Sequence, residues 1–164
     1  MDLYIERTIE KPYEPLAAAL MAGPSTWLPG QRPDGGATVE LDVRLGASRV
    51  ARRVVVRTGE VSSVPGHARC LLPVAWQAAD HPERYPKLVG RLELVESGPR
   101  RTMLALRAVY HPPAGLVGEA ADHAAMHLVA EASVRAFLTR VAGILERKAM
   151  SRLLAVAEPF PHGE

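Results

Sequence analysis

The sequence predicts an α+β domain in which a curved antiparallel sheet of six or seven strands wraps around a long C-terminal helix, with short helices after the first strand. In successive segments joined by short turns, apolar and polar residues alternate with a period of two, which is typical of antiparallel strands with one wet face. Residues 116–147 carry no proline and follow a 3.6-residue pattern, which indicates an amphipathic helix. The chain has 164 residues, so we expect one domain over 1–157 and a frayed tail over 158–164.

Composition excludes several classes of protein. The chain is 48% hydrophobic and 23% charged with a net charge of +2, and it has two Trp, four Tyr and two Phe residues. Neither disorder nor a basic nucleic-acid-binding face is indicated. Cys70 is the only cysteine, so an intramolecular disulfide is excluded. Because there is no signal peptide and no apolar run near ~20 residues, we expect a cytoplasmic protein without membrane insertion, and leave a homodimer open.

The first third of the chain combines a strand with a short helix. Residues 3–10 alternate with a period of two, which predicts a strand. Residues 13–21 predict a short helix with Pro15 in its first turn, where the missing N–H costs little. Glycine and proline then crowd residues 23–36, which predicts a loop or a second helical turn followed by a loop.

The middle of the chain predicts a β-meander. Five alternating segments are separated by turn residues, and they cover 38–45, 49–58, 68–78, 88–96 and 101–110. A short additional strand is expected within 60–64. Pro73 interrupts one of the segments, which favours an edge position or a bulge for it.

The last third predicts one long helix. At about 100° per residue, its apolar face collects His123, His127, Ala130, Val134, Phe137, Leu138, Val141, Ile144 and Leu145. This stripe ends after Leu145. Leu153, Leu154 and Val156 either continue as exposed helix or pack on another surface.

Several local motifs occur in this order of elements. They are Leu72-Pro73-Val74-Ala75-Trp76, Tyr85-Pro86-Lys87-Leu88, Leu92-Glu93-Leu94, Arg101-Thr102, and Tyr110-His111-Pro112-Pro113-Ala114-Gly115 followed by Gly118. With them the chain resembles the START-like, Bet v 1-like (SRPBCC) helix-grip superfamily, which includes polyketide cyclases/dehydratases and bacterial lipid-pocket proteins. The resemblance covers Leu3 to about Arg147. It implies a helix-grip fold, a bacterial source and a cavity for an apolar ligand, but no catalytic residues, because the superfamily has no universal catalytic motif.

A histidine pair marks the start of the long helix. His123 and His127 are four residues apart on the face that we predict to point inward. A metal site needs a third ligand, for which Glu119 or His111 is a candidate, and the HExxH motif is absent. We therefore expect no metal and no cofactor. Instead we place both histidines at the mouth of a pocket, as hydrogen-bond partners of a polar ligand head.

Arg52 is a polar residue on a predicted inner face, between Val50 and Val54. A buried guanidinium must pair with an acid, reach the rim or meet an anionic group of a ligand. Arg7 occupies a similar position in the first strand, where a long side chain can also extend to solvent.

Trp76 and Tyr110 each end an apolar strand face, so they either anchor the core or form a pocket wall with the tyrosine hydroxyl aimed at a ligand. Cys70 shares its strand face with no basic residue, which predicts an inert buried thiol.

Three functions follow from this interpretation. The first is binding of a lipid- or polyketide-like hydrophobic molecule between the sheet and the helix. The second is a cyclase/dehydratase-type enzyme that uses His, Tyr and Arg side chains of the pocket. The third is a protein-interaction domain with a filled cavity. The residues expected to contact a ligand are Arg52, Val54, Trp76, Leu92, Leu106, Tyr110, His123, His127, Ala130 and Val134.

Overall fold

The structure, a computed structural model, describes residues 1–28, 30, 36–111 and 120–157, with the backbone alone over 120–123 and at 157. Its elements run in the order β1 (Asp2–Ile9), α1 (Tyr13–Met21), α2 (Pro24–Trp27), β2 (Gly36–Leu45), β3 (Ser48–Thr58), β4 (Ser62–Ser63), β5 (Arg69–Ala78), the 3-10 turn η1 (Pro82–Arg84), β6 (Lys87–Gly98), β7 (Arg101–His111) and α3 (Ala120–Ala157). The tail predicted over 158–164 lies outside the described residues.

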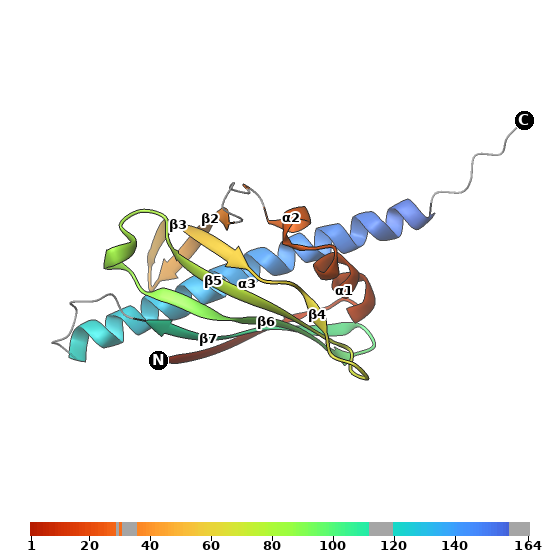
Figure 1. Cartoon of the computed structure of the whole chain (residues 1–164), viewed down its shortest axis with the longest axis horizontal. Coiled ribbons are helices and arrows are strands. Elements are labelled where there is room, and N and C mark those ends of the chain that lie inside the picture. The colour runs from red at the N-terminus through yellow and green to blue at the C-terminus, as the bar shows by residue number, and fades with distance from the viewer. Residues whose placement is uncertain (29, 31–35, 112–119, 158–164) are drawn as a thin grey trace, which may run out of the picture.

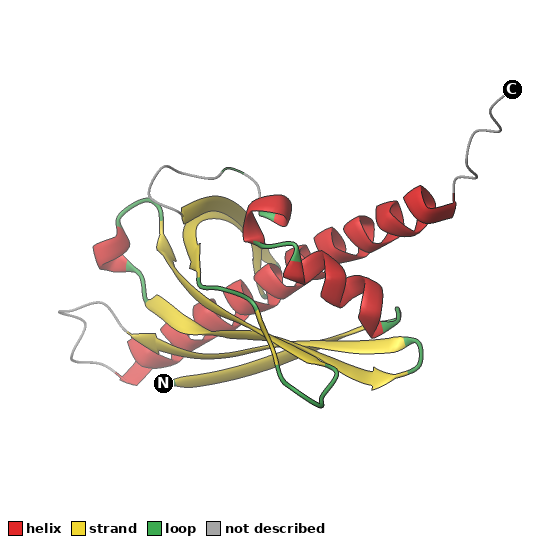
Figure 2. Ribbon diagram, turned by 45° about the vertical axis from the view of Figure 1, so that its right-hand side comes forward, coloured by secondary structure: helices red, strands yellow, loops and turns green. Residues whose placement is uncertain are grey.

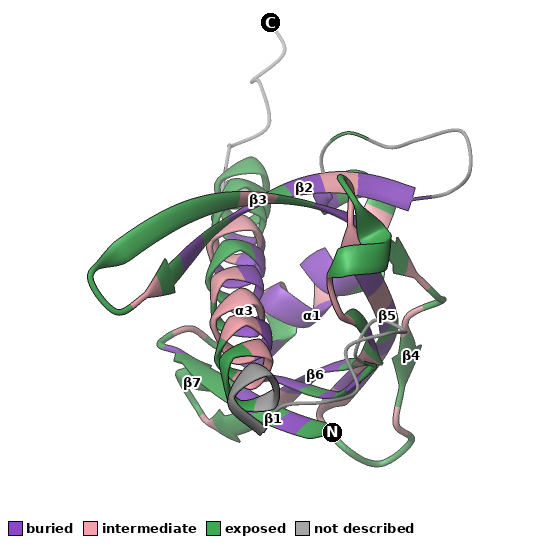
Figure 3. Ribbon diagram, turned by 90° about the vertical axis from the view of Figure 1, so that its left-hand side faces the viewer, coloured by how far each residue is buried: buried purple, intermediate pink, exposed green. Residues whose placement is uncertain are grey.

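The strands form one antiparallel sheet that curls around α3 (Figures 1 and 2). Their order is β1-β7-β6-β5-β3-β2, and β4 pairs with β5 beside this path. The two edge strands, β1 and β2, both contact α3, and α1 packs on α3 as well. Viewed along α3, the buried residues gather inside the curl (Figure 3). This arrangement confirms the predicted α+β class, the six or seven strands and the short helices after the first strand.

Period-two alternation separates the two faces of the sheet. On β6, Leu92 and Leu94 are buried on the concave face, whereas Glu93 faces the convex side. Arg69 and Arg91 donate hydrogen bonds of 2.6 and 2.8 Å to the Glu93 carboxylate. Burial alone would raise the pKa of Glu93, but these hydrogen bonds outweigh it and hold the pKa below its ordinary value of 4.5.

Pro73 does not lie on an edge strand, contrary to one of the two expectations. β5 pairs with β6 on one side and with β3 and then β4 on the other. The pairing with β3 ends at Val74, and the Gly59 N–H donates to the Pro73 carbonyl at 2.9 Å. Because the N and C=O of a strand residue face the same side, the missing N–H of Pro73 falls where β5 changes partner.

The helix α3 is longer than the 116–147 predicted, since it continues to Ala157. The predicted residues 116–119 lie outside the described residues. Leu153, Leu154 and Val156 are exposed, which confirms the first of the two alternatives for this segment. Within the described residues, none of the helices combines the length and apolar content needed to cross a bilayer.

Candidate functional site

Side chains fill most of the interior between the sheet and α3. Its largest fully buried residues are Ile9, Leu16, Leu20, Leu41, Leu72, Leu92, Leu94, Leu104, Leu106, Phe137, Leu138 and Leu145. The Phe137 ring lies 4.8 Å from the ring of Trp76, centroid to centroid. Leucines from the sheet and from the helices do most of the filling.

One space remains at the end of the interior where β7 meets the start of α3, with a volume of about 50 Å³. It is lined by Arg52, Arg53, Trp76, Ala78, Tyr85, Pro86, Leu88, Tyr110, Val129, Ala130 and Ser133. Pockets for small molecules usually measure about 300–1,000 Å³. The space we call the Arg52 pocket therefore accommodates only a few non-hydrogen atoms without movement of its walls.

A cation and a phenol form the polar side of the Arg52 pocket. Arg52 Nη1 donates a hydrogen bond of 2.6 Å to the Tyr85 hydroxyl, and Arg52 Cζ lies 4.5 Å from the centroid of the Tyr85 ring. Arg52 is half-buried, and among the described residues no carboxylate pairs with it. The neighbouring Arg53 differs, because its guanidinium is bound by Asp80 at 2.9 Å. Of the two arginines that line the pocket, Arg52 therefore lacks an ionic partner in the described part of the chain.

Tyr110 and His127 lie next to each other at the same end of the interior. Their ring centroids are 6.0 Å apart, and the Tyr110 hydroxyl donates to Met1 Sδ at 3.0 Å. Burial raises the pKa of Tyr110, so its phenol stays protonated near neutral pH. The Nδ1 of His127 is buried with no hydrogen-bond partner among the described residues. A buried unpartnered nitrogen is costly, so this atom is a candidate hydrogen-bonding group for a ligand or a water molecule.

The structure brings four of the ten predicted ligand residues to the Arg52 pocket: Arg52, Trp76, Tyr110 and Ala130. The His127 ring lies 6.0 Å from the Tyr110 ring, centroid to centroid, and His127 is not among the residues that line the pocket. Four others, Val54, Leu92, Leu106 and Val134, belong to the packed core. The side chain of His123 lies outside the described residues. Arg7 is exposed, and its Nη1 lies 3.4 Å from the Thr139 hydroxyl of α3.

Sequence reasoning missed Tyr85 and Ser133 as pocket residues. Tyr85 follows η1 in a loop, and a loop residue has no face that periodicity can assign. Its Tyr-Pro pair was noted only as a mark of the fold. Ser133 lies between the predicted apolar positions of α3 and donates to the Val129 carbonyl at 2.7 Å.

The described residues contain no group of three His, Cys, Asp or Glu side chains that could hold a metal ion. Cys70 is buried and lies 3.0 Å from the Tyr13 hydroxyl. Its burial matches the prediction, and its reactivity stays a prediction.

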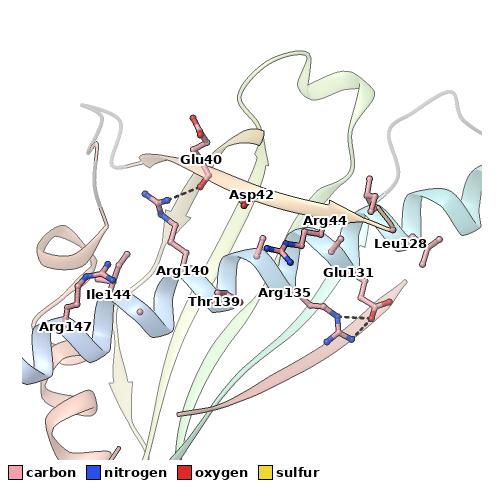
Figure 4. A pocket seen from close by; sticks show the side chains of 15 residues that line it. Glu40, Asp42, Arg44, Leu128, Glu131, Arg135, Thr139, Arg140, Ile144 and Arg147 are labelled. Atoms are coloured by element: carbon pink, nitrogen blue, oxygen red, sulfur yellow. Dashed lines mark hydrogen bonds and ion pairs between the residues drawn. The ribbon is translucent and has the colours of Figure 1, made fainter. Parts of the chain in front are cut away.

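A second hollow is an open groove of about 990 Å³ between β2 and α3 (Figure 4). Some of its charged side chains are paired and others, such as Arg44 and Arg147, have no ion pair among the described residues. Arg135 binds Glu131 at 2.6 Å, Arg49 binds Asp42, and Arg140 donates to the Glu40 carbonyl at 3.2 Å. The lining mixes charged side chains with the apolar side chains of Leu45, Leu128 and Ile144, and the groove is open to solvent.

Comparisons with known proteins support the fold. No protein-family model matches the chain, and no curated protein matches it. Among solved structures, a conserved protein from Geobacillus kaustophilus shares 13% identity at a TM-score of 0.52, with 90% of this chain and 96% of the other covered. An aromatase/cyclase, Zhui, from Streptomyces sp. R1128 shares 16% identity at 0.45, covering 97% and 100%. A START superfamily protein from Mycobacterium smegmatis shares 15% at 0.44, covering 89% and 97%.

At these identities the likeness concerns the fold alone. The strand order and the curl of the sheet around the long C-terminal helix make a helix-grip architecture, and the Geobacillus kaustophilus protein has a similar fold. The resemblance stated from the sequence is thereby confirmed at the level of the fold.

Proposed function

We propose that the chain binds a hydrophobic small molecule that carries an anionic group, a lipid- or polyketide-like acid, with that group at Arg52. The observation that carries this proposal is the half-buried guanidinium of Arg52, which donates to the Tyr85 hydroxyl and to no carboxylate of the described residues. Guanidinium groups bind carboxylate and phosphate through two parallel hydrogen bonds. Arg52 uses one nitrogen on Tyr85, which leaves further donors for an anion.

The remaining walls of the Arg52 pocket suit an apolar chain. Trp76, Leu88 and Ala130 present carbon surface beside the polar pair. Since the space measures about 50 Å³, it takes the anionic group and the first atoms attached to it. A longer apolar part enters only when side chains of the pocket change rotamer, a common response at binding sites.

Paired ligands that differ by one charge test this function. Dodecanoate and methyl dodecanoate are titrated by calorimetry into the wild type, Arg52→Gln and the control Arg49→Gln, which changes an exposed arginine of the same strand outside the pocket. We expect the wild type and the control to bind the acid at least roughly tenfold more tightly than Arg52→Gln does, because a hydrogen-bonded ion pair is lost. The ester is expected to bind weakly and equally to all three. Absence of binding, or equal acid affinity in wild type and Arg52→Gln, would contradict the proposal.

A second candidate is proton transfer of the cyclase/dehydratase kind, and the observation that favours it is the unpartnered Nδ1 of His127 beside Tyr110. In this function His127 accepts a proton from the substrate, and the protonated phenol of Tyr110 donates a hydrogen bond to the substrate. Incubation with a β-hydroxythioester, which can lose its α-proton and its β-hydroxyl group together as water, followed by mass spectrometry, tests it. Loss of a water-elimination product in His127→Gln supports the candidate, and absence of product in the wild type excludes it for that substrate.

A further inference from the structure

The C-terminal end of α3 is a helical segment that runs past α1 and α2 (Figure 1). Ala149 is the last buried residue of α3. Beyond it, the apolar side chains face solvent: Met150 is 47% exposed, Leu153 57%, Leu154 64% and Val156 87%. Four large exposed apolar side chains within seven residues are unusual for a surface that has no partner.

The same segment carries a cationic face. At about 100° per residue, Met150, Leu153, Leu154 and Val156 fall within one arc of roughly 160°. Arg147, Lys148 and Arg152 fall on the opposite arc together with Ser151. Residues 147–157 contain no Asp or Glu. Among the described residues, no ion pair involves any of these three cations. The segment is therefore amphipathic, with a net positive charge and an uncovered apolar face.

We infer that this segment, the α3 extension (residues 147–157), binds the surface of a membrane rich in anionic lipids. Its apolar face enters the boundary between head groups and acyl chains, while Arg147, Lys148 and Arg152 remain at the level of the lipid phosphates. Basic amphipathic helices bind membranes in this way, through buried apolar area added to electrostatic attraction.

Charge argues against a second copy of the chain as the occupant. If two extensions met along their apolar faces, the flanking cations of one copy would face those of the other. No carboxylate within 147–157 is present to neutralise them. Juxtaposed like charges are a strong penalty in an interface. The charge of the segment is therefore complementary to that of an anionic partner.

The width of the apolar arc favours a flat surface over a groove in an acidic protein. A helix held in a groove presents a narrow line of anchors at i, i+3, i+4 and i+7. Here Met150, Leu153 and Leu154 form such a line, and Val156 widens it, so the exposed apolar side chains spread over nearly half of the helix circumference. A planar lipid boundary contacts such an arc along its whole width.

Vesicle co-sedimentation of the full-length chain tests the inference. The vesicles consist either of phosphatidylcholine alone or of phosphatidylcholine mixed with phosphatidylglycerol. We expect binding to the mixed vesicles that falls as salt rises. Lys148→Gln with Arg152→Gln is expected to lower the partition coefficient roughly tenfold or more, since each cation near an anionic surface contributes separately. Leu153→Gln with Leu154→Gln is expected to abolish binding.

Leu128→Gln is the matched control, because Leu128 lies near the other end of α3 and is 59% exposed. It should bind vesicles as the wild type does. The inference is overturned if the wild type stays in solution with mixed vesicles, or if Leu153→Gln with Leu154→Gln binds as well as the control. A dimer seen by light scattering in the wild type and lost in this double variant, without vesicle binding, would assign the face to a second copy.

Discussion

The two ends of the interior differ in what fills them. Near α1, the space between the sheet and α3 is packed with leucines and contains the Tyr13–Cys70 contact. Near the start of α3, the walls hold Arg52, Tyr85 and Tyr110 around a space of about 50 Å³. One fold thus has a closed apolar end and an open polar end, with Trp76 and Phe137 between them. Stability is concentrated at the first end and ligand recognition, as proposed, at the second.

The largest loss of stability is expected from a substitution at the boundary between the two ends. Phe137→Ala removes a fully buried ring that packs on Trp76, and the free energy of unfolding should fall by about 3–5 kcal/mol. Urea denaturation measures this loss, and Leu128→Ala, at an exposed position of the same helix, should change little. A loss below ~1 kcal/mol would mean that the boundary is not tightly packed.

A smaller effect is expected on the convex side of the strands that form the closed end. Glu93→Gln weakens the hydrogen bonds to Arg69 and Arg91 and should lower the free energy of unfolding by about 1–2 kcal/mol at pH 7. Since the folded pKa of Glu93 is below 4.5, the carboxylate stabilises the fold fully above pH 4.5. That contribution is lost as the pH falls through the folded pKa.

Urea denaturation of wild type and Glu93→Gln between pH 7 and pH 3 measures the contribution of the Glu93 carboxylate to the free energy of unfolding. The difference between the two proteins should be constant down to about pH 4.5 and then shrink. A difference that grows as the pH falls would show that the sign assigned to Glu93 is wrong.

A polar contact between Tyr13 and Cys70 lies in the closed end, and removing it should have a modest effect. The Tyr13 hydroxyl lies 3.0 Å from Cys70 Sγ, and burial together with this contact raises the pKa of Tyr13. Tyr13→Phe should lower the free energy of unfolding by about 0.5–1 kcal/mol, since the bond to sulfur is weak. Tyr4→Phe, which removes an exposed hydroxyl, is the control for thermal unfolding. Equal melting temperatures for the two variants would show that the contact between Tyr13 and Cys70 does not stabilise the fold.

The smallest change in stability is expected at the open end. Arg52→Gln should lower the free energy of unfolding by less than about 1 kcal/mol, because the half-buried guanidinium loses its contacts with Tyr85 but no ionic partner in the described part of the chain. Paired with its expected loss of acid binding, this result would separate recognition from stability. A loss above ~2 kcal/mol would instead make Arg52 a structural residue.

Periodicity predicted the fold well because each strand alternates cleanly. The segment from Cys70 to Trp76 shows why, since every second residue is buried against α3. Periodicity also placed Arg52, Trp76 and Tyr110 on the concave face, where they meet. Periodicity could not predict the size of the cavity, because the volume depends on how leucines from distant elements interdigitate. Tyr85 was missed since its loop has no period, and its contact with Arg52 spans 33 positions of the chain.

Native mass spectrometry of protein purified under mild conditions, with organic extraction of any bound molecule, tests the central claim most directly. The account predicts an apolar molecule with a carboxylate or phosphate group, near one per chain in the wild type and depleted in Arg52→Gln. A wild-type chain that carries nothing and takes up no added dodecanoate would contradict it. The filled interior would then favour a protein-interaction domain, in which the packed core supports an outer surface.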